Sequence, residues 1–295
     1  MDTLTITRYD IPVKGVKKKT ICHFSDVHLT AYDDLSTPEE REKAIGDTQG
    51  WMDTRRFFAE KYGCPTGEAQ MADSRLQFSR LLALANTADG AVITGDIMNN
   101  VTPADIRATE AGLATLRVPF VAVCGNHEQA KKLPDGLLLS MMKQPISVVD
   151  LGDLQLVGVD NSDRIITPTQ LAQVEALLAG GKPTVVALHV PMLTPDNYAA
   201  VYGCGEYFRM NDFDGCPPEN DRFRELFPPL PWWRCCRDIC IFSALPRLPA
   251  ACSNTVFPKA SPATFTSTQS ENKEKTDAPL CIGFSYISMV SPVAK

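Results

Sequence analysis

Short apolar runs that end in polar turns are the main pattern between residues 20 and 190. Runs of this length, bounded by Gly, Asn and Asp residues, predict buried strands. The predicted buried strands are residues 20–24, 91–93, 120–123, 154–159 and 184–188. A further strand is predicted at residues 5–11, at the edge of a sheet.

Helical patterns alternate with these strands. Ser74 is predicted to cap a helix that ends near residue 86. Further helices are predicted at residues 102–116 and 169–178, each with a proline near its start. The apolar stripe of the first helix is predicted to consist of Leu76, Leu81, Leu82 and Leu84. Strands that alternate with helices predict an α/β fold of two mixed sheets with the helices outside.

Residues 31–75 break this alternation. The segment is polar, and we expect it to be irregular, with Trp51, Phe57 and Phe58 as scattered anchors. A segment this long between two strands is more often a lid or a wall of a site than part of the core.

The composition changes after Leu226. Residues 227–295 hold nine of the 22 prolines and five of the ten cysteines, and no helical or strand period is expected across residues 227–279. We therefore predict two parts, a folded domain at residues 1–226 and an aberrant or disordered tail at residues 227–295.

Composition and charge narrow the class of protein. The chain has 295 residues, of which 44% are hydrophobic and 22% charged, as in ordinary globular proteins. The formal net charge of −6 and the single compact basic run at residues 17–19 argue against a nucleic-acid surface. No apolar run is long enough to span a membrane, and the N-terminus lacks the apolar centre of a signal peptide. We therefore expect a cytoplasmic protein without a membrane anchor.

Side chains that bind metals follow the predicted strands directly. Because the carboxyl ends of strands in α/β sheets gather ligands, we expect these side chains to lie close together. Carboxylate and imidazole groups together suit Mn, Fe or Zn better than Ca or Mg. The side chains of the metal-ligand type are Asp26, His28, Asp96, Asn126, His127 and His189.

Asp96 is the centre of this prediction. Its two oxygens allow it to hold two cations, and two cations about 3.5–4 Å apart can clamp a phosphoryl group. Taken singly, each motif has an ordinary structural explanation, because Gly-Asp is common in turns and a lone histidine is usually a core residue. The combination of Asp26-x-His28, Gly95-Asp96, the run from Gly125 to Glu128, and His189 is specific.

These motifs resemble those of the calcineurin-like metallophosphoesterases over roughly residues 20–226. The resemblance implies a four-layer sandwich of two mixed β-sheets flanked by helices, two divalent metal ions and a small phosphate-ester substrate. Because the pattern is lost after Leu226, we expect the second sheet to be incomplete in this chain. It implies Asp26 and His28 as ligands of one ion, Asn126 and His189 as ligands of the other, and Asp96 as the bridge. His127 would stabilise or protonate the leaving oxygen, and Glu128 would orient His127. The flanking residues favour the bacterial phosphoesterase and phosphodiesterase branch, and the oligomeric state is left open.

The family completes its site with Gly-His-x-His, and this motif is absent. The chain has four histidines, and His23 is expected to lie in the core or on a sheet face. Back-translation of residues 232–243, read one base out of frame, permits Val-Ala-Val-Leu-Pro-Gly-His-Leu-His-Phe-Gln. We therefore infer a one-base frameshift near Leu226; the alternative is a real, divergent tail.

Two functions remain open at this point. The first is metal-dependent hydrolysis of phosphate mono- or diesters, impaired in this chain by the loss of two ligand histidines. The second is a non-catalytic remnant that binds metal or phosphate.

Overall fold

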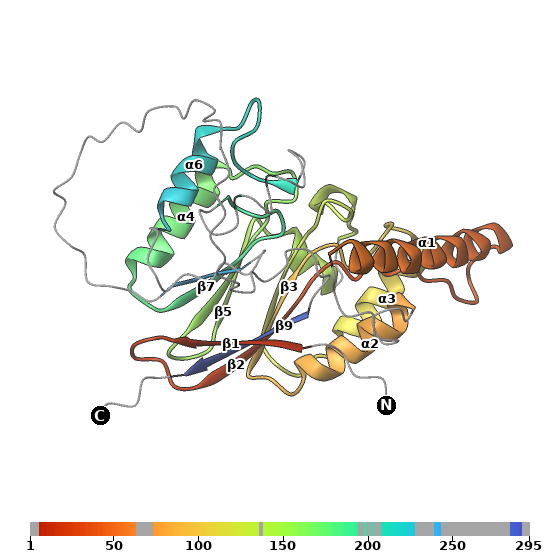
Figure 1. The fold of residues 1–295 in the computed structure, drawn as a ribbon, viewed down its shortest axis with the longest axis horizontal. Helices are drawn as coiled ribbons and strands as arrows, with labels where there is room; N and C mark the ends of the chain where they lie inside the picture. The colour runs from red at the N-terminus through yellow and green to blue at the C-terminus, as the bar shows by residue number, and fades with distance from the viewer. Residues whose placement is uncertain are drawn as a thin grey trace, which may run out of the picture.

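Two β-sheets packed face to face form the centre of the protein in the computed structural model (Figure 1). The structure describes residues 6–62, 73–135, 138–193 and 208–227, Tyr198 and Tyr202, and two strands at residues 239–242 and 284–290. The first sheet has the strand order β1-β9-β2-β3-β4 and the second the order β5-β6-β7-β8. Both sheets combine parallel and antiparallel pairs, so the prediction of two mixed sheets is confirmed.

The strands and helices have the following bounds. The first sheet contains β1 (Ile6–Pro12), β2 (Lys19–Phe24), β3 (Gly90–Thr94), β4 (Phe120–Val123) and β9 (Phe284–Val290). The second contains β5 (Ile146–Asp150), β6 (Gln155–Val159), β7 (Thr184–Ala187) and β8 (Ile239–Phe242). The helices are α1 (Pro38–Tyr62), α2 (Ser74–Ala85), α3 (Pro103–Leu113), α4 (Pro168–Ala179) and α6 (Pro218–Glu225), with 3-10 turns η1 (Ala130–Lys132) and η2 (Leu138–Lys143).

Neighbouring side chains along each strand face opposite sides of the sheet and so belong to different layers. In β3, Ile93 packs with the residues of α2 and α3, whereas its neighbour Val92 packs between the two sheets. In β6, Leu156 faces the layer between the sheets and Val157 faces the layer under α4 and α6. Helices therefore cover the outer face of each sheet (Figure 1), as the four-layer prediction requires.

The region at residues 31–75 corrects the prediction of an irregular segment, because most of it is the long helix α1. Thr37 and Glu40 form a reciprocal cap, in which Oε2 of Glu40 accepts from the Thr37 N–H at 2.8 Å and Oγ1 of Thr37 accepts from the Glu40 N–H at 3.2 Å. Phe57, predicted as an anchor, is 58% exposed. The helix lacks a continuous apolar stripe, which is why the hydrophobic pattern did not reveal it.

The structure corrects the prediction for helix α2 at its N-cap and at one position of its buried face. The cap is Asp73, whose Oδ1 accepts from the N–H groups of Arg75 and Leu76, and Ser74 is the first helical residue. Leu76 is 47% exposed, and Phe78 takes its place in the buried face. Asp and Ser are both good N-caps, so sequence alone did not separate them.

Two strands lie within residues 227–295. Strand β8 pairs antiparallel with β7, which corrects the expectation that no strand occurs across residues 227–279. Its sequence, Ile-Cys-Ile-Phe, consists of apolar residues that suit a strand, although the polar and Pro-rich surroundings masked this signal. Strand β9 lies between β1 and β2, and β1 is the edge strand, as predicted. The proposed boundary at Leu226 stays a prediction.

The described part of the chain contains no helix with the length and apolar character needed to cross a bilayer.

Protonation of His23 is expected to destabilise the fold at acid pH. His23 is 4% exposed, its Nε2 lies 2.8 Å from Oγ1 of Thr94, and burial lowers its pKa from 6.5 to about 3. Between these values the unfolded chain binds a proton that the folded chain does not. The free energy of unfolding should therefore fall by up to about 1.4 kcal/mol per pH unit as the pH drops through this window.

Urea unfolding of the unsubstituted protein and of His23→Gln, at about pH 6.5 and about pH 4.5, measures this term. The acid-induced loss of stability should be smaller in His23→Gln. An equal loss in both proteins would contradict the assignment.

Candidate metal centre

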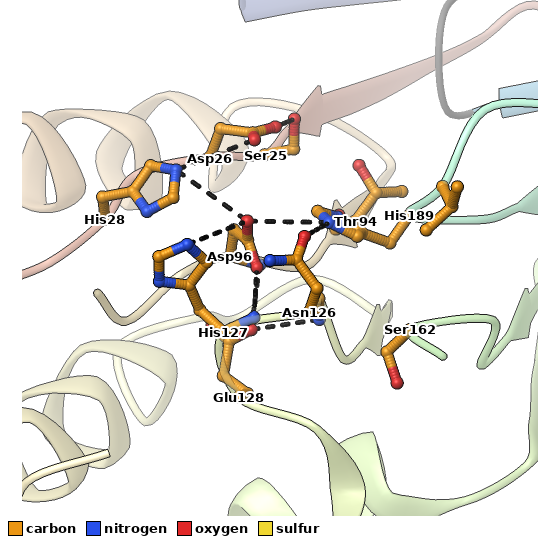
Figure 2. A network of polar contacts seen from close by, with 12 residues as sticks. Ser25, Asp26, His28, Thr94, Asp96, Asn126, His127, Glu128, Ser162 and His189 are labelled. Atoms are coloured by element: carbon orange, nitrogen blue, oxygen red, sulfur yellow. Dashed lines mark hydrogen bonds and ion pairs between the residues drawn. The ribbon is translucent and has the colours of Figure 1, made fainter. Parts of the chain in front are cut away.

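Loops that follow β2, β3, β4 and β7 meet around the carboxylate of Asp96 (Figure 2). Nε2 of His28 lies 3.9 Å from Oδ2 of Asp96 and 3.8 Å from Oδ1 of Asp26. On the other side, Nε2 of His189 lies 3.6 Å from Oδ2 of Asp96 and 3.1 Å from Oδ1 of Asn126. The structure thus brings together all five side chains that the sequence predicted as metal ligands.

The spacing of these atoms fits shared cations. Two donors that are each about 2.1 Å from one ion lie about 3.0–3.4 Å apart. The observed separations of 3.1–3.9 Å are at or slightly above this range, so small side-chain movements would complete the geometry. Asp96 and His28 are buried, whereas 41% of the Asp26 side chain is exposed, so solvent reaches the centre from the side of Asp26.

The position of the proton on the neutral His189 ring gives a second reason to place a cation here. Nδ1 of His189 lies 2.7 Å from the carbonyl oxygen of Thr94, which only accepts hydrogen bonds, so Nδ1 carries a proton. In the neutral ring, Nε2 then presents a lone pair toward the oxygens of Asn126 and Asp96. Three acceptors that face one another are stabilised by a cation, and a histidine that donates its other N–H to a carbonyl is typical of metal ligands.

Left-handed backbone conformations orient the candidate ligands of the first two loops. The φ angles of Asp26, His28 and Asp96 are +52°, +46° and +49°. Non-glycine residues rarely adopt these values, and clusters of them occur at functional sites because the surrounding structure maintains the strain. Here the two loops hold each other, because the N–H groups of Asp26 and His28 donate to the carbonyl oxygens of Gly95 and Asp96 at 3.0 and 2.9 Å.

Two glycines allow the loops after β3 and β4 to touch. A Cβ atom at Gly95 would overlap the backbone of Gly125, and one at Gly125 would overlap the amide nitrogen and carboxylate of Asp96. Gly95 also has a φ of +80°. The glycines of the Gly-Asp and Gly-Asn pairs are therefore needed for the two loops to approach each other closely.

Glu128 joins the same two loops from beneath. Its carboxylate is fully buried and accepts hydrogen bonds from the N–H groups of Asp96, Met98 and Gly125 at 3.0, 2.7 and 3.0 Å. Burial, together with the nearby charge of Asp96, raises the pKa of Glu128. Glu128 thus ties the backbone of the Asp96 loop to that of the Asn126 loop.

His127 has a different partner from the one expected. Nδ1 of His127 lies 2.7 Å from the carbonyl oxygen of Asn99, whereas the carboxylate of Glu128 is engaged with the backbone. Nε2 of His127 faces Oδ2 of Asp96 at 4.0 Å, and 30% of the side chain is exposed. Together with His28 and Asp96, His127 forms a compact group whose ligand atoms lie within 4.8 Å of one another.

Sequence reasoning missed the residues that support the ligands. Oδ1 of Asn161 accepts from the N–H groups of His189 and Val190 at 2.9 and 3.0 Å, which positions the His189 loop. Trp51, expected only as an anchor, stacks on His28 with 3.7 Å between the ring centroids. The strand-terminal position of Asn161 was the only signal in the sequence, and Trp51 had none that linked it to the site.

The fold and this centre agree with a family comparison. The chain matches the calcineurin-like phosphoesterases over residues 19–224, which is more than half of its length. The protein therefore belongs to the calcineurin-like phosphoesterase family, whose members are metal-dependent phosphoester hydrolases. A search of curated proteins finds no match to the chain.

Replacing Glu128 with Gln should destabilise the protein markedly. The amide can accept through one oxygen only, and its NH₂ group would face backbone N–H donors, so buried donors lose their partner. We expect the free energy of unfolding to fall by about 3 kcal/mol. The matched control is Glu175→Gln in α4, whose carboxylate pairs with Arg222 at the surface and should cost less than about 0.5 kcal/mol. Chemical denaturation of both variants measures the difference, and equal losses would contradict the assigned role.

Proposed function

We propose that this site is built for hydrolysis of phosphate mono- or diesters with two divalent metal ions, of Mn, Fe or Zn. The observation that carries the proposal is the position of the Asp96 carboxylate between two sets of donors. Asp26 and His28 would hold one ion, Asn126 and His189 the other, and Asp96 both. The mixture of carboxylate, imidazole and amide donors suits these metals.

Two ions at such a site polarise the phosphoryl group and lower the pKa of the attacking water. The side chains of the protein would position the reacting groups and supply a proton. Nε2 of His127 is directed toward the centre, and its partly exposed ring is accessible to a substrate. We assign it to donate a proton to the leaving oxygen. The contact of Nδ1 with the carbonyl oxygen of Asn99 keeps the ring in this orientation.

The activity of the chain as written is proposed to be low. The family motif Gly-His-x-His is absent, and His23 does not replace it because it is buried and bonded to Thr94. Each ion would then lack one imidazole, and a misplacement of about 1 Å can cost roughly a hundredfold in rate. The competing function, a remnant that binds metal or phosphate without hydrolysis, rests on the same missing ligands.

A one-base frameshift near Leu226 is our proposed origin of the missing motif. The shifted reading of residues 232–243 includes Gly-His-Leu-His and covers the residues of β8, which lies beside the His189 strand β7. A histidine pair near this strand would be suitably placed to reach both ions.

Metal binding should depend on Asp96. Calorimetry with Mn²⁺ is expected to show binding in the micromolar range or weaker, because ligands are missing from each ion. Asp96→Asn should abolish this binding, since it removes the charge shared by both ions. The control Asp33→Asn, at a partly exposed aspartate outside the centre that pairs with Arg107 at 2.7 Å, should bind Mn²⁺ as before. Tight binding that survives in Asp96→Asn would show that the ligand assignment is wrong.

Shifting the frame near Leu226 should restore hydrolysis stimulated by Mn²⁺. The experiment expresses both frames and assays each on aryl phosphate mono- and diesters with and without Mn²⁺. In the shifted protein, His127→Ala should reduce turnover by about 10²–10⁴-fold while the metal content stays near normal. A loss of metal content would make His127 a ligand. A shifted protein that binds two metal ions and hydrolyses neither ester would favour the binding remnant.

A further inference from the structure

Helix α1 touches the metal centre along one face. The inward positions of the helix recur at intervals of three and four residues, namely Ala44, Asp47, Thr48 and Trp51. Oδ2 of Asp47 accepts from the side chain of Asn100 at 2.9 Å, and the hydroxyl groups of Thr48 and Thr30 lie 2.5 Å apart. These contacts dock the helix on the loops that follow β2 and β3.

Trp51 is the residue of this face that reaches the candidate ligands. Its ring lies parallel to that of His28, with 12° between the planes and 3.7 Å between the centroids. Nε2 of His28 points toward Asp26 and Asp96, so the stacked indole restricts the rotation that would turn this atom away. The contact with a candidate ligand is direct.

A second contact of Trp51 leads to His127. Nε1–H of Trp51 donates to Oδ1 of Asn99 at 2.7 Å, and the carbonyl oxygen of the same Asn99 holds Nδ1 of His127 at 2.7 Å. The rings of His28 and His127 meet edge to face at 4.7 Å. The indole therefore contacts the His28 ring by stacking, and it reaches the His127 ring both through Asn99 and by an edge-to-face contact with 6.2 Å between the ring centroids.

We propose that Trp51 is a positioning residue of this site, which orients His28 for metal binding by stacking and orients His127 by its hydrogen bond to Asn99. The inference rests on the proposed function, since it assigns a purpose to the orientation of both rings. If Trp51 served only to pack α1, its ring contacts and its hydrogen bond would not converge on the two histidines that flank Asp96.

Substitutions at Trp51 separate the two contacts. Trp51→Phe keeps a ring over His28 and removes the N–H donor, so the Kd for Mn²⁺ should change by less than about twofold. The ring N–H of His127 should then exchange with solvent about tenfold faster or more, because Asn99 is no longer held. Trp51→Ala removes the ring contacts with both histidines as well as the hydrogen bond to Asn99, and it should also raise the Kd for Mn²⁺ by about tenfold or more.

The measurements are Mn²⁺ calorimetry and NMR of the imidazole N–H signals, which is practicable because the chain has only four histidines. Asn99→Ala should reproduce the effect of Trp51→Phe on His127. The double variant should exchange little faster than either single variant, because both substitutions remove the same hydrogen bond between Trp51 and Asn99. Phe57→Ala on the same helix, at a side chain that is 58% exposed, is the control and should leave both signals unchanged.

The outcomes are distinct. If the unsubstituted protein binds no Mn²⁺, the proposed function fails and this inference fails with it. If it binds Mn²⁺ and Trp51→Ala changes neither the Kd nor the exchange of the His127 N–H, only this inference is overturned. Equal effects of Phe57→Ala and Trp51→Ala would likewise overturn it, because general loosening of α1 would then explain the result.

Discussion

The contact between the loops after β3 and β4 is the constraint on which the rest of the site depends. Gly95 and Gly125 leave room for the two backbones to touch, and the buried carboxylate of Glu128 accepts N–H groups from both. This contact sets the position of Asp96, and the other candidate ligands are arranged around its carboxylate. Two glycines and a buried glutamate, none of which holds a metal in our proposal, thus fix the geometry of the candidate metal centre.

Electrostatics explains why such an arrangement suits cations. The oxygens of Asp26, Asp96 and Asn126 face the Nε2 atoms of His28 and His189 at 3.1–3.9 Å. Acceptors gathered at this spacing repel one another unless a cation or a proton lies between them. A cation would therefore stabilise this arrangement, whereas the layers of the fold are held by apolar packing.

Helix α1 shows how a polar segment becomes part of a site. Most of its described side chains are exposed, and the reciprocal Thr37–Glu40 cap stabilises its start. A narrow face that includes Asp47, Thr48 and Trp51 meets the loops after β2 and β3. Hydrophobic periodicity detects helices that bury a wide apolar stripe. It therefore did not predict this helix or the proposed role of Trp51.

The sequence by itself determined the buried strands, the α/β layers and the five candidate ligands at the strand ends. These features depend on local periodicity and on the rule that carboxyl ends of strands gather at one edge. Only the tertiary structure decided the partners of His127 and Glu128, because a hydrogen bond to the carbonyl of Asn99 or to three backbone N–H groups has no side-chain signature. The same holds for β9, which pairs with β1 and β2 from the opposite end of the chain. Long-range pairing is set by the packing of whole layers, and no local pattern encodes it.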